Sequence, residues 1–199
     1  MIEVRGLTKA YKGVRALDGV SFSVAAGGTL AVVGQSGAGK STLARILARW
    51  ERADAGTVAG VTSVQMLIQE AGASLNPRFT ALEAVAEPLV VNGLPAGAAE
   101  ELLMQAGIVA DEWHRKTDTF SGGERARIAL VRALALKPDL LVLDEPFSSL
   151  DRATQGRMME LLTGLRARHP FALIAVLHDR KLAAAMASQV LELRAGKVV

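Results

Sequence analysis

The sequence contains no cysteine, which excludes disulfides, cysteine-ligated zinc clusters and thiol catalysis. Aromatic residues are also scarce, at 4% of the 199 residues, whereas 50% of the chain is hydrophobic and rich in alanine, valine and leucine. A composition of this kind suits a packed α/β protein of one domain.

The chain likewise lacks a strong excess of charge and a long apolar run. Its 23 basic and 20 acidic residues leave a formal net charge of +3, with no dense basic stripe that would indicate a nucleic-acid surface. The longest apolar runs, such as residues 171–177, are far shorter than the ~18 residues needed to span a bilayer. No apolar run follows the first basic residue, so we expect no signal peptide. Any membrane role must therefore come through a partner.

Hydrophobic periodicity predicts strands that alternate with helices. Thr29 to Val33 and Leu140 to Leu143 are continuous apolar runs, as buried parallel strands should be. Residues 72–120 between them carry apolar side chains at helical spacing, which predicts a helical insertion. The other expected elements are strands at 2–7, 21–24, 63–68, 171–177 and 190–193, helices at 40–50, from 121 and after 151, and a C-terminal edge strand.

Residues 34–42 match the pattern G-x-x-x-x-G-K-[ST] and lie between an expected strand and an expected helix. Glycines let backbone N–H groups converge on an anion, and the helix N-terminus adds its dipole. Lys40 supplies a positive charge for the β- and γ-phosphates, and the Ser41 hydroxyl can coordinate Mg²⁺. The alternative is a chance match, with a frequency of roughly 1% in such a chain. We therefore predict a nucleoside triphosphate site formed by Ser36, Gly37, Ala38, Gly39, Lys40, Ser41 and Thr42.

The expected strand at 140–143 ends in two carboxylates, Asp144 and Glu145. Parallel strands present their C-terminal ends to the ligand crevice, so Asp144 can bind Mg²⁺ through water. Glu145 can face the γ-phosphate as the general base for the attacking water, a role that contributes ~10²–10⁴-fold in rate. Alone, such a strand end is as often just a strand reaching solvent; the phosphate loop upstream favours the catalytic interpretation.

Further motifs follow in a characteristic order. Gln69 lies between the phosphate loop and the sequence Ser-Gly-Gly-Glu at 121–124, Ser-Ser-Leu-Asp follows the acidic strand at 148–151, and His178 ends the next strand. With these motifs, the chain resembles an ATP-binding cassette (ABC) ATPase over essentially its whole length. The resemblance implies one nucleotide-binding domain, 1–199, of the α/β class.

The implied fold has a P-loop core, a small antiparallel β subdomain and a helical subdomain. The P-loop core and the β subdomain are assigned to residues 1–71 and 121–199, and the helical subdomain is assigned to residues 72–120.

The resemblance gives the signature at 121–124 a role across a dimer. In the family, this segment binds the γ-phosphate held by the opposite subunit, and its members here are Ser121, Gly122, Gly123 and Glu124. A purely structural role is compatible with this one, because Ser121 is a good N-cap and Glu124 completes a capping box. The family's usual glutamine is Glu124 in this chain.

The remaining roles also come from the resemblance. Tyr11 matches the aromatic that stacks on adenine, although a core tyrosine at a strand end is the alternative. Gln69 matches the residue that touches Mg²⁺ and reports the nucleotide state to the helical part. His178 matches the histidine that contacts the γ-phosphate and orients the water of Glu145, although a lone histidine there is usually structural. Asp151 is expected to cap its helix and to lie at the dimer seam. The implied metal-binding residues are Ser41, Gln69 and Asp144.

Residues 69–78 point to one branch of the family. Their sequence, Gln-Glu-Ala-Gly-Ala-Ser-Leu-Asn-Pro-Arg, resembles the segment of oligopeptide, dipeptide and nickel or metal-chelate importers that docks the permease. A plain turn is the alternative, since Asn-Pro favours turns. The stretch between Lys40 and Gln69 is shorter than usual, and we expect no extension after the last strand of the kind common in this branch. The sequence leaves the substrate open.

The resemblance implies an ATPase that powers an importer. ATP would close a dimer with a second ABC ATPase, identical or different, and hydrolysis would reopen it while the membrane permease follows. We expect an indirect link to a substrate-binding protein, a peripheral place on the cytoplasmic face of the inner membrane, and no direct nucleic-acid contact. One alternative is a soluble ABC ATPase in nucleic-acid maintenance, translation or assembly, although we expect neither the long coiled-coil insertion nor the second cassette usual there. A nucleotide-gated binding module is another, against which the intact Glu145 and His178 argue.

Overall fold

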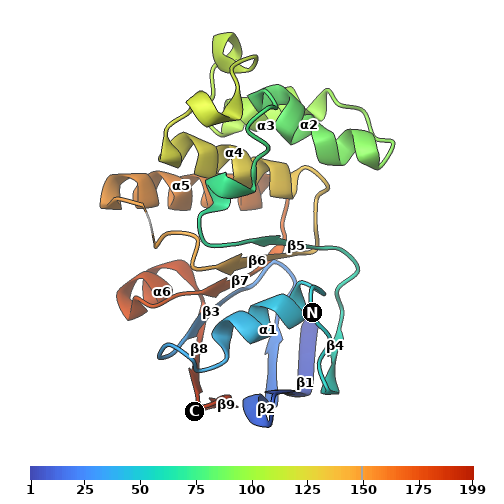
Figure 1. Ribbon diagram of the computed structural model, residues 1–199, viewed down its shortest axis with the longest axis vertical. Coiled ribbons are helices and arrows are strands. Elements are labelled where there is room, and N and C mark those ends of the chain that lie inside the picture. The colour runs from blue at the N-terminus through green and yellow to red at the C-terminus, as the bar shows by residue number, and fades with distance from the viewer. Residues whose placement is uncertain (149) are drawn as a thin grey trace. The chain divides into compact units, whose positions relative to one another are not determined.

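The computed structural model describes residues 1–148 and 150–199, so Ser149 of the expected 148–151 motif lies outside the described residues. The chain forms two compact units (Figure 1). The first contains residues 1–66, 138–145 and 170–199, and the second contains residues 67–137 and 146–169. The assignment of 72–120 as a helical subdomain stays a prediction.

The first unit is built on a six-stranded sheet in the order β5-β6-β7-β3-β8-β9. Its central strands β6, β7 and β3 run parallel and are almost wholly buried, which explains their continuous apolar sequences. Strand β8 extends the sheet in parallel beside β3, and β9 closes the edge antiparallel to β8. The strands are β3 (Thr29–Val33), β5 (Val64–Leu67), β6 (Leu140–Asp144), β7 (Ala172–Val176), β8 (Gln189–Arg194) and β9 (Lys197–Val198).

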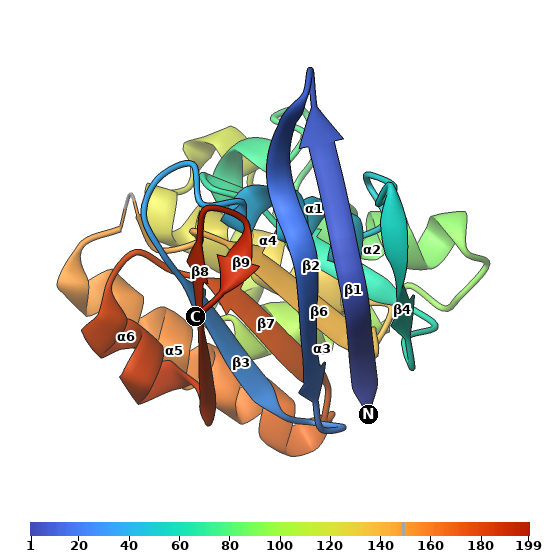
Figure 2. The same ribbon diagram turned by 90° about the horizontal axis from the view of Figure 1, so that it is seen from below.

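The predicted antiparallel β subdomain is confirmed as a three-stranded sheet in the order β2-β1-β4 (Figure 2). Its strands β1 (Ile2–Tyr11) and β2 (Val14–Val24) are longer than predicted, and β4 (Ala55–Ala59) pairs with β1. Lys12 and Gly13 join them with φ of 47° and 85°, as a two-residue hairpin turn requires. Register shifts along β1 interrupt the alternation of side chains, which is why the sequence pattern showed only the strand ends.

Helix α1 (Lys40–Leu47) shares one hydrophobic core with both sheets of this unit. Leu7 from β1, Val32 from β3 and Leu43 from α1 are fully buried in it. The helix was predicted to reach Trp50 but ends at Leu47, because Arg49 adopts a left-handed φ of 61°. The second helix of the unit, α6 (Arg180–Met186), is capped by the Asp179 side chain.

The second unit is helical. Helix α4 contacts α2, α3, α5 and the turn η1, and Figure 1 shows it between α5 and the α2–α3 pair. Thr80 and Glu83 form a capping box at the start of α2, and Pro88 lies inside that helix. The elements are η1 (Ala71–Ser74), α2 (Ala81–Val91), α3 (Ala98–Gln105), η2 (Ala110–Glu112), η3 (Thr117–Thr119), α4 (Gly122–Leu134) and α5 (Arg152–Arg168). Within the part of the chain that is described, no helix is long and apolar enough to cross a membrane.

Candidate nucleotide site

The loop between β3 and α1 curls around the amino group of Lys40. This side chain is only 5% exposed, and its Nζ donates to the carbonyl oxygens of Gly34 at 2.8 Å and Gln35 at 3.0 Å. Gly39 has a φ of 100°, and a Cβ there would lie 2.2 Å from the carbonyl oxygen of Ala16. Only glycine fits this position, so the loop is fixed by local sterics and by its own lysine. Among the described residues no side chain caps the start of α1, which leaves the N–H groups of its first turn available to an anion such as a polyphosphate.

A cavity of about 670 Å³ runs along this loop. It is lined by Gln35 to Ala38 of the loop, by His178 after β7, by Arg180 at the start of α6 and by Arg194 at the end of β8. Arg180 pairs with Glu192 at 2.5 Å, a contact on the same wall. Two arginines and one glutamate give the lining a net positive charge, which suits an anionic ligand. Arg180 is a residue that the motif analysis missed, since no motif includes it.

Ser41 and Asp144 bring two hard oxygen donors together at the end of β6. The Ser41 hydroxyl donates to Oδ1 of Asp144 at 3.2 Å. Burial raises the pKa of Asp144, the Ser41 hydrogen bond opposes this, and the nearby charge of Glu145 raises that pKa further. A hydroxyl and a carboxylate fit Mg²⁺, which in phosphate sites takes few protein ligands and leaves the rest to water and phosphates. Such a site needs no cluster of three His, Cys, Asp or Glu side chains, and among the described residues there is none.

Glu145 and His178 follow the neighbouring strands β6 and β7, and their side chains are in contact. Oε1 of Glu145 lies 2.6 Å from Nε2 of His178, and their side chains are 18% and 53% exposed. Glu145 adopts a left-handed φ of 52°, which costs a non-glycine residue about 1 kcal/mol, and its N–H donates to Val176 of β7 at 3.1 Å. The strained backbone therefore aims a sheltered carboxylate at a more exposed imidazole, an arrangement able to take a proton from a water molecule.

Tyr11 ends β1 and is 41% exposed, so the alternative of a buried core tyrosine is wrong. Its hydroxyl donates to Oε2 of Glu51 at 2.6 Å. Burial raises the pKa of the Tyr11 phenol, the Glu51 carboxylate raises it further, and the Thr42 hydroxyl of the phosphate loop lowers it. The phenol therefore lies within reach of the loop, with part of its ring open to solvent.

The signature forms its own hollow in the second unit. The predicted capping box is confirmed, because Ser121 Oγ accepts from the N–H of Glu124 and Glu124 Oε2 accepts from the N–H of Ser121 at 2.8 Å. The predicted cap by Asp151 is confirmed too, with Oδ1 accepting from the N–H of Thr154 at 3.0 Å. A cavity of about 430 Å³ lies beside both helix starts and is lined by Ser121 to Glu124, Arg127, Asp151 and Arg157.

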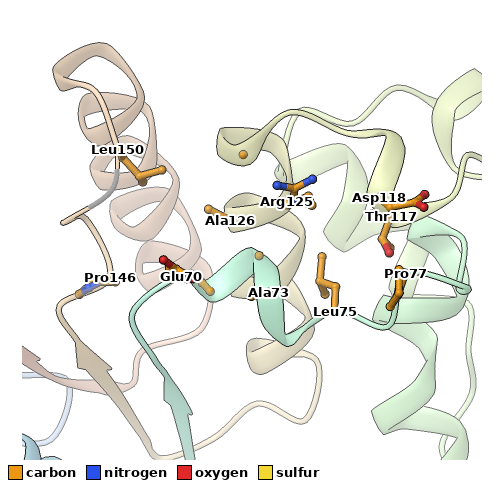
Figure 3. Close-up of a pocket in the computed structure, with 13 residues that line it drawn as sticks. Glu70, Ala73, Leu75, Pro77, Thr117, Asp118, Arg125, Ala126, Pro146 and Leu150 are labelled. Atoms are coloured by element: carbon orange, nitrogen blue, oxygen red, sulfur yellow. The ribbon is translucent and has the colours of Figure 1, made fainter.

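Gln69 lies in the turn after β5, is exposed, and belongs to the second unit. The segment that follows it borders a cavity of about 490 Å³ in this unit (Figure 3). Arg125 of α4 and Leu75 face this cavity, with Glu70 and Pro146 on one side and Pro77 on the other. Gly72 packs so closely that a Cβ would lie 2.7 Å from Cβ of Arg125, which seats η1 against α4.

Comparison with known proteins identifies this architecture, since residues 17–148 match the ABC transporter family. The chain belongs to this family. It is 38% identical to a di/tripeptide transport ATP-binding protein of Pseudomonas aeruginosa, over 97% of this chain and 66% of that protein. It is 37% identical to an aliphatic sulfonates import ATP-binding protein of Agrobacterium fabrum, over 100% of this chain and 78% of that protein. A third relative, an Fe(3+) ions import ATP-binding protein of Rhodococcus jostii, is 35% identical over 99% of this chain and 60% of its own length.

The solved structures give the same answer for the fold. A dimeric, post-hydrolysis structure of the ATP-binding cassette MJ0796 with ADP and Pi has a TM-score of 0.86 and 26% identity, covering 100% of this chain and 96% of its own. The resemblance to an ABC ATPase and the α/β fold class are therefore confirmed. The matched transporter proteins favour the transport interpretation over a soluble ABC ATPase.

Within this ABC ATPase domain, the structure brings most of the predicted residues together in two groups. Lys40, Ser41, Asp144, Glu145 and His178 gather in the first unit. The signature and Asp151 gather in the second. Besides Arg180, sequence reasoning missed Glu51, whose contact with Tyr11 spans 40 positions of sequence and leaves no local pattern.

Proposed function

We propose that this ABC domain hydrolyses MgATP at sites shared between two cassettes and thereby powers import through a membrane permease. The observation that carries the proposal is the constellation around Lys40, in which Ser41 meets Asp144 and Glu145 meets His178. It offers the three parts that phosphoryl transfer to water requires: a phosphate clamp, a place for a cation and a general base.

Each residue then has a defined task. Lys40 and the loop N–H groups bind the β- and γ-phosphates, and Tyr11 stacks on the adenine. Ser41 and Asp144 would hold Mg²⁺, which when bound neutralises charge on the phosphates. Glu145 takes a proton from the attacking water, and His178, whose Nε2 lies 2.6 Å from Oε1 of Glu145, keeps that carboxylate in place.

The second half of the proposal is that the signature serves the nucleotide of another cassette. Its hollow contains the N-terminal N–H groups of α4, which attract an anion. The dimeric structure of the similar cassette MJ0796 supports a dimer as the working form. Two chains then form two equivalent sites, each with the phosphate loop of one chain and the signature of the other.

Mixing two inactive variants tests this sharing. Lys40→Ala removes the phosphate clamp, and Ser121→Arg blocks the signature, so each variant alone should be inactive. In an equal mixture half of the dimers are mixed, and each has one intact site of two, so about a quarter of the parent ATPase activity should return. Activity should also fall on dilution to the monomer. A mixture that stays as inactive as its components would contradict shared sites.

We further propose that the cavity beside residues 69–78 receives a helix of the permease. The segment resembles the docking segment of peptide and metal-chelate importers, and the cavity in Figure 3 combines apolar Leu75 and Pro77 with the charge of Arg125. A cavity that combines apolar and charged side chains suits a protein interface. The domain would then lie on the cytoplasmic face of the inner membrane, with a substrate-binding protein acting through the permease.

The cargo proposed is a peptide or a metal chelate, including nickel. It rests on residues 69–78 and on the di/tripeptide transport relative at 38% identity. The test is transport by the chain together with its permease in vesicles. Ala73→Arg, an exposed cavity residue, should abolish transport and leave basal ATPase activity unchanged. Ala96→Arg, equally exposed but outside the cavity, is the matched control. Equal transport by both variants would contradict docking in this cavity.

A further inference from the structure

Tyr11 is held by a network of charged side chains at the end of β1. Its hydroxyl donates to Oε2 of Glu51 at 2.6 Å. The other oxygen of that carboxylate lies 3.4 Å from Nζ of Lys9, and this amino group also donates to the carbonyl oxygen of Arg52 at 2.8 Å. Lys9 is only 15% exposed at its side chain, and its amino group lies 5.6 Å from the centre of the Tyr11 ring. The phenol is therefore tied to a carboxylate that is itself tied to a lysine.

The backbone next to Tyr11 is fixed by the same segment. Oδ2 of Asp54 accepts from the N–H of Ala10 at 2.8 Å, while Oδ1 of Asp54 pairs with Lys9 at 3.1 Å. The N–H of Asp54 donates in turn to Thr8 at 2.9 Å. Both the main chain before Tyr11 and the tip of its side chain are thus held by residues 51–54.

This segment is the direct continuation of the helix that begins at the phosphate loop. Helix α1 runs from Lys40 to Leu47, the chain turns back at Arg49, and the N–H of Glu51 reaches the carbonyl oxygen of Arg45 at 3.3 Å. One helix therefore presents the phosphate loop at its start and, through the turn that follows it, the acceptor for Tyr11. The phosphate subsite and the ring of Tyr11 are set at a fixed separation by α1.

We propose that Glu51, held by Lys9, is a positioning residue that fixes the Tyr11 ring for the base of the bound nucleotide. The inference rests on the proposed function, in which Tyr11 stacks on adenine. An exposed tyrosine at a hairpin end has rotational freedom that binding would have to remove, and the bond to Glu51 removes it beforehand. Glu51 touches neither phosphates nor the reacting water, so its loss should weaken nucleotide binding and leave the chemical step intact.

The test compares the ATP kinetics of five variants with those of the parent. Tyr11→Phe removes only the hydroxyl, and Glu51→Ala removes the acceptor; each should raise the KM for ATP about 3- to 10-fold at unchanged kcat. The double variant should be no worse than either single variant, because both remove the same bond. Glu51→Gln should recover most of the affinity, since an amide oxygen still accepts from a phenol. Glu3→Ala, on the same strand and away from Tyr11, is the control that should match the parent.

Raman spectroscopy can distinguish loss of the Tyr11–Glu51 hydrogen bond from a general loss of structure. Tyr11 is the only tyrosine in the chain, so the tyrosine Raman doublet reports its hydroxyl alone. In the parent the doublet should show a strong donor bond to a carboxylate. Glu51→Ala should shift it to a solvent-bonded phenol, whereas Glu3→Ala should not.

Two results would overturn the inference in different ways. If Tyr11→Ala raises the KM for ATP while Tyr11→Phe and Glu51→Ala match the parent, stacking stands and the positioning role of Glu51 is wrong. If Tyr11→Ala itself leaves the KM unchanged, the adenine assignment of the proposed function fails and the positioning role falls with it. Should Glu51→Ala fold poorly, Tyr11→Phe still decides the matter, because it removes only the hydroxyl oxygen and keeps the ring.

Discussion

Replacing Glu145 by glutamine isolates the proposed chemical step from nucleotide binding. The amide keeps the shape of the carboxylate and can still accept a hydrogen bond from Nε2 of His178, which lies 2.6 Å from Oε1 in the parent. The backbone bond from residue 145 to Val176 does not involve the side chain and should persist. What the substitution removes is the ability to take a proton at neutral pH.

The size of the effect follows from this role. A general base contributes ~10²–10⁴-fold, so kcat of Glu145→Gln should fall by that factor, a barrier rise of about 3–5 kcal/mol. ATP affinity should be equal or tighter, because a negative charge facing the γ-phosphate has been removed. Phosphate release at saturating MgATP measures the first quantity, and calorimetric titration with ATP measures the second. ATP-dependent dimers of the variant should persist in light scattering.

One result would refute the reasoning outright. A kcat within about threefold of the parent would show that Glu145 is not the base. A large loss of ATP affinity would show instead that Glu145 acts in binding. His178→Ala should also slow turnover, since it removes the group that keeps the carboxylate in place.

Three further substitutions test other parts of the site. Asp144→Asn should stabilise the nucleotide-free protein at neutral pH but weaken the effect of Mg²⁺ on ATP binding. The pKa of Asp144 is raised in the folded protein, so the parent loses stability as pH rises through that pKa. Thermal denaturation at several pH values should show this loss in the parent and not in the variant. Gly39→Ala should lower the free energy of unfolding by at least ~2 kcal/mol in urea, because its Cβ would lie 2.2 Å from the carbonyl oxygen of Ala16, whereas Gly37→Ala, with a φ of 78° and open space, should cost about 1 kcal/mol; equal costs would contradict the steric argument. Glu124→Gln should reduce the loss of stability on acidification, because the capping hydrogen bonds lower the pKa of Glu124 and their contribution is lost as pH falls through that value; an unchanged acid profile would contradict this.

Local sequence patterns predicted the parts of the fold that local physics decides. The strand Thr29–Val33 was predicted with its observed bounds, because a strand buried on both faces must be apolar throughout. Ser121 and Asp151 were recognised as caps because their side chains satisfy N–H groups two or three residues away. The hairpin of β1 and β2 was underestimated because its register shifts break the alternation.

Contacts between distant residues set the limit of sequence reasoning at the site. The signature, Glu145 and His178 were found by their motifs. Glu51 and Arg180 carry no motif, and only the folded chain shows Glu51 beside Tyr11 and Arg180 beside the phosphate loop. Motifs identify residues that many relatives need, whereas side chains that merely hold those residues depend on how each chain packs.

Glu145 also occupies a special place in the connectivity of the chain. It is the last residue of a segment of the first unit, and Pro146 begins the next segment of the second unit. A residue before proline disfavours helical backbone angles, and Glu145 nevertheless has a left-handed φ of 52°. The ring of Pro146 fixes its own φ and restricts the backbone of the residue before it. The left-handed backbone of Glu145 is therefore held from both sides, by the bond from its N–H to Val176 and by the proline that follows it.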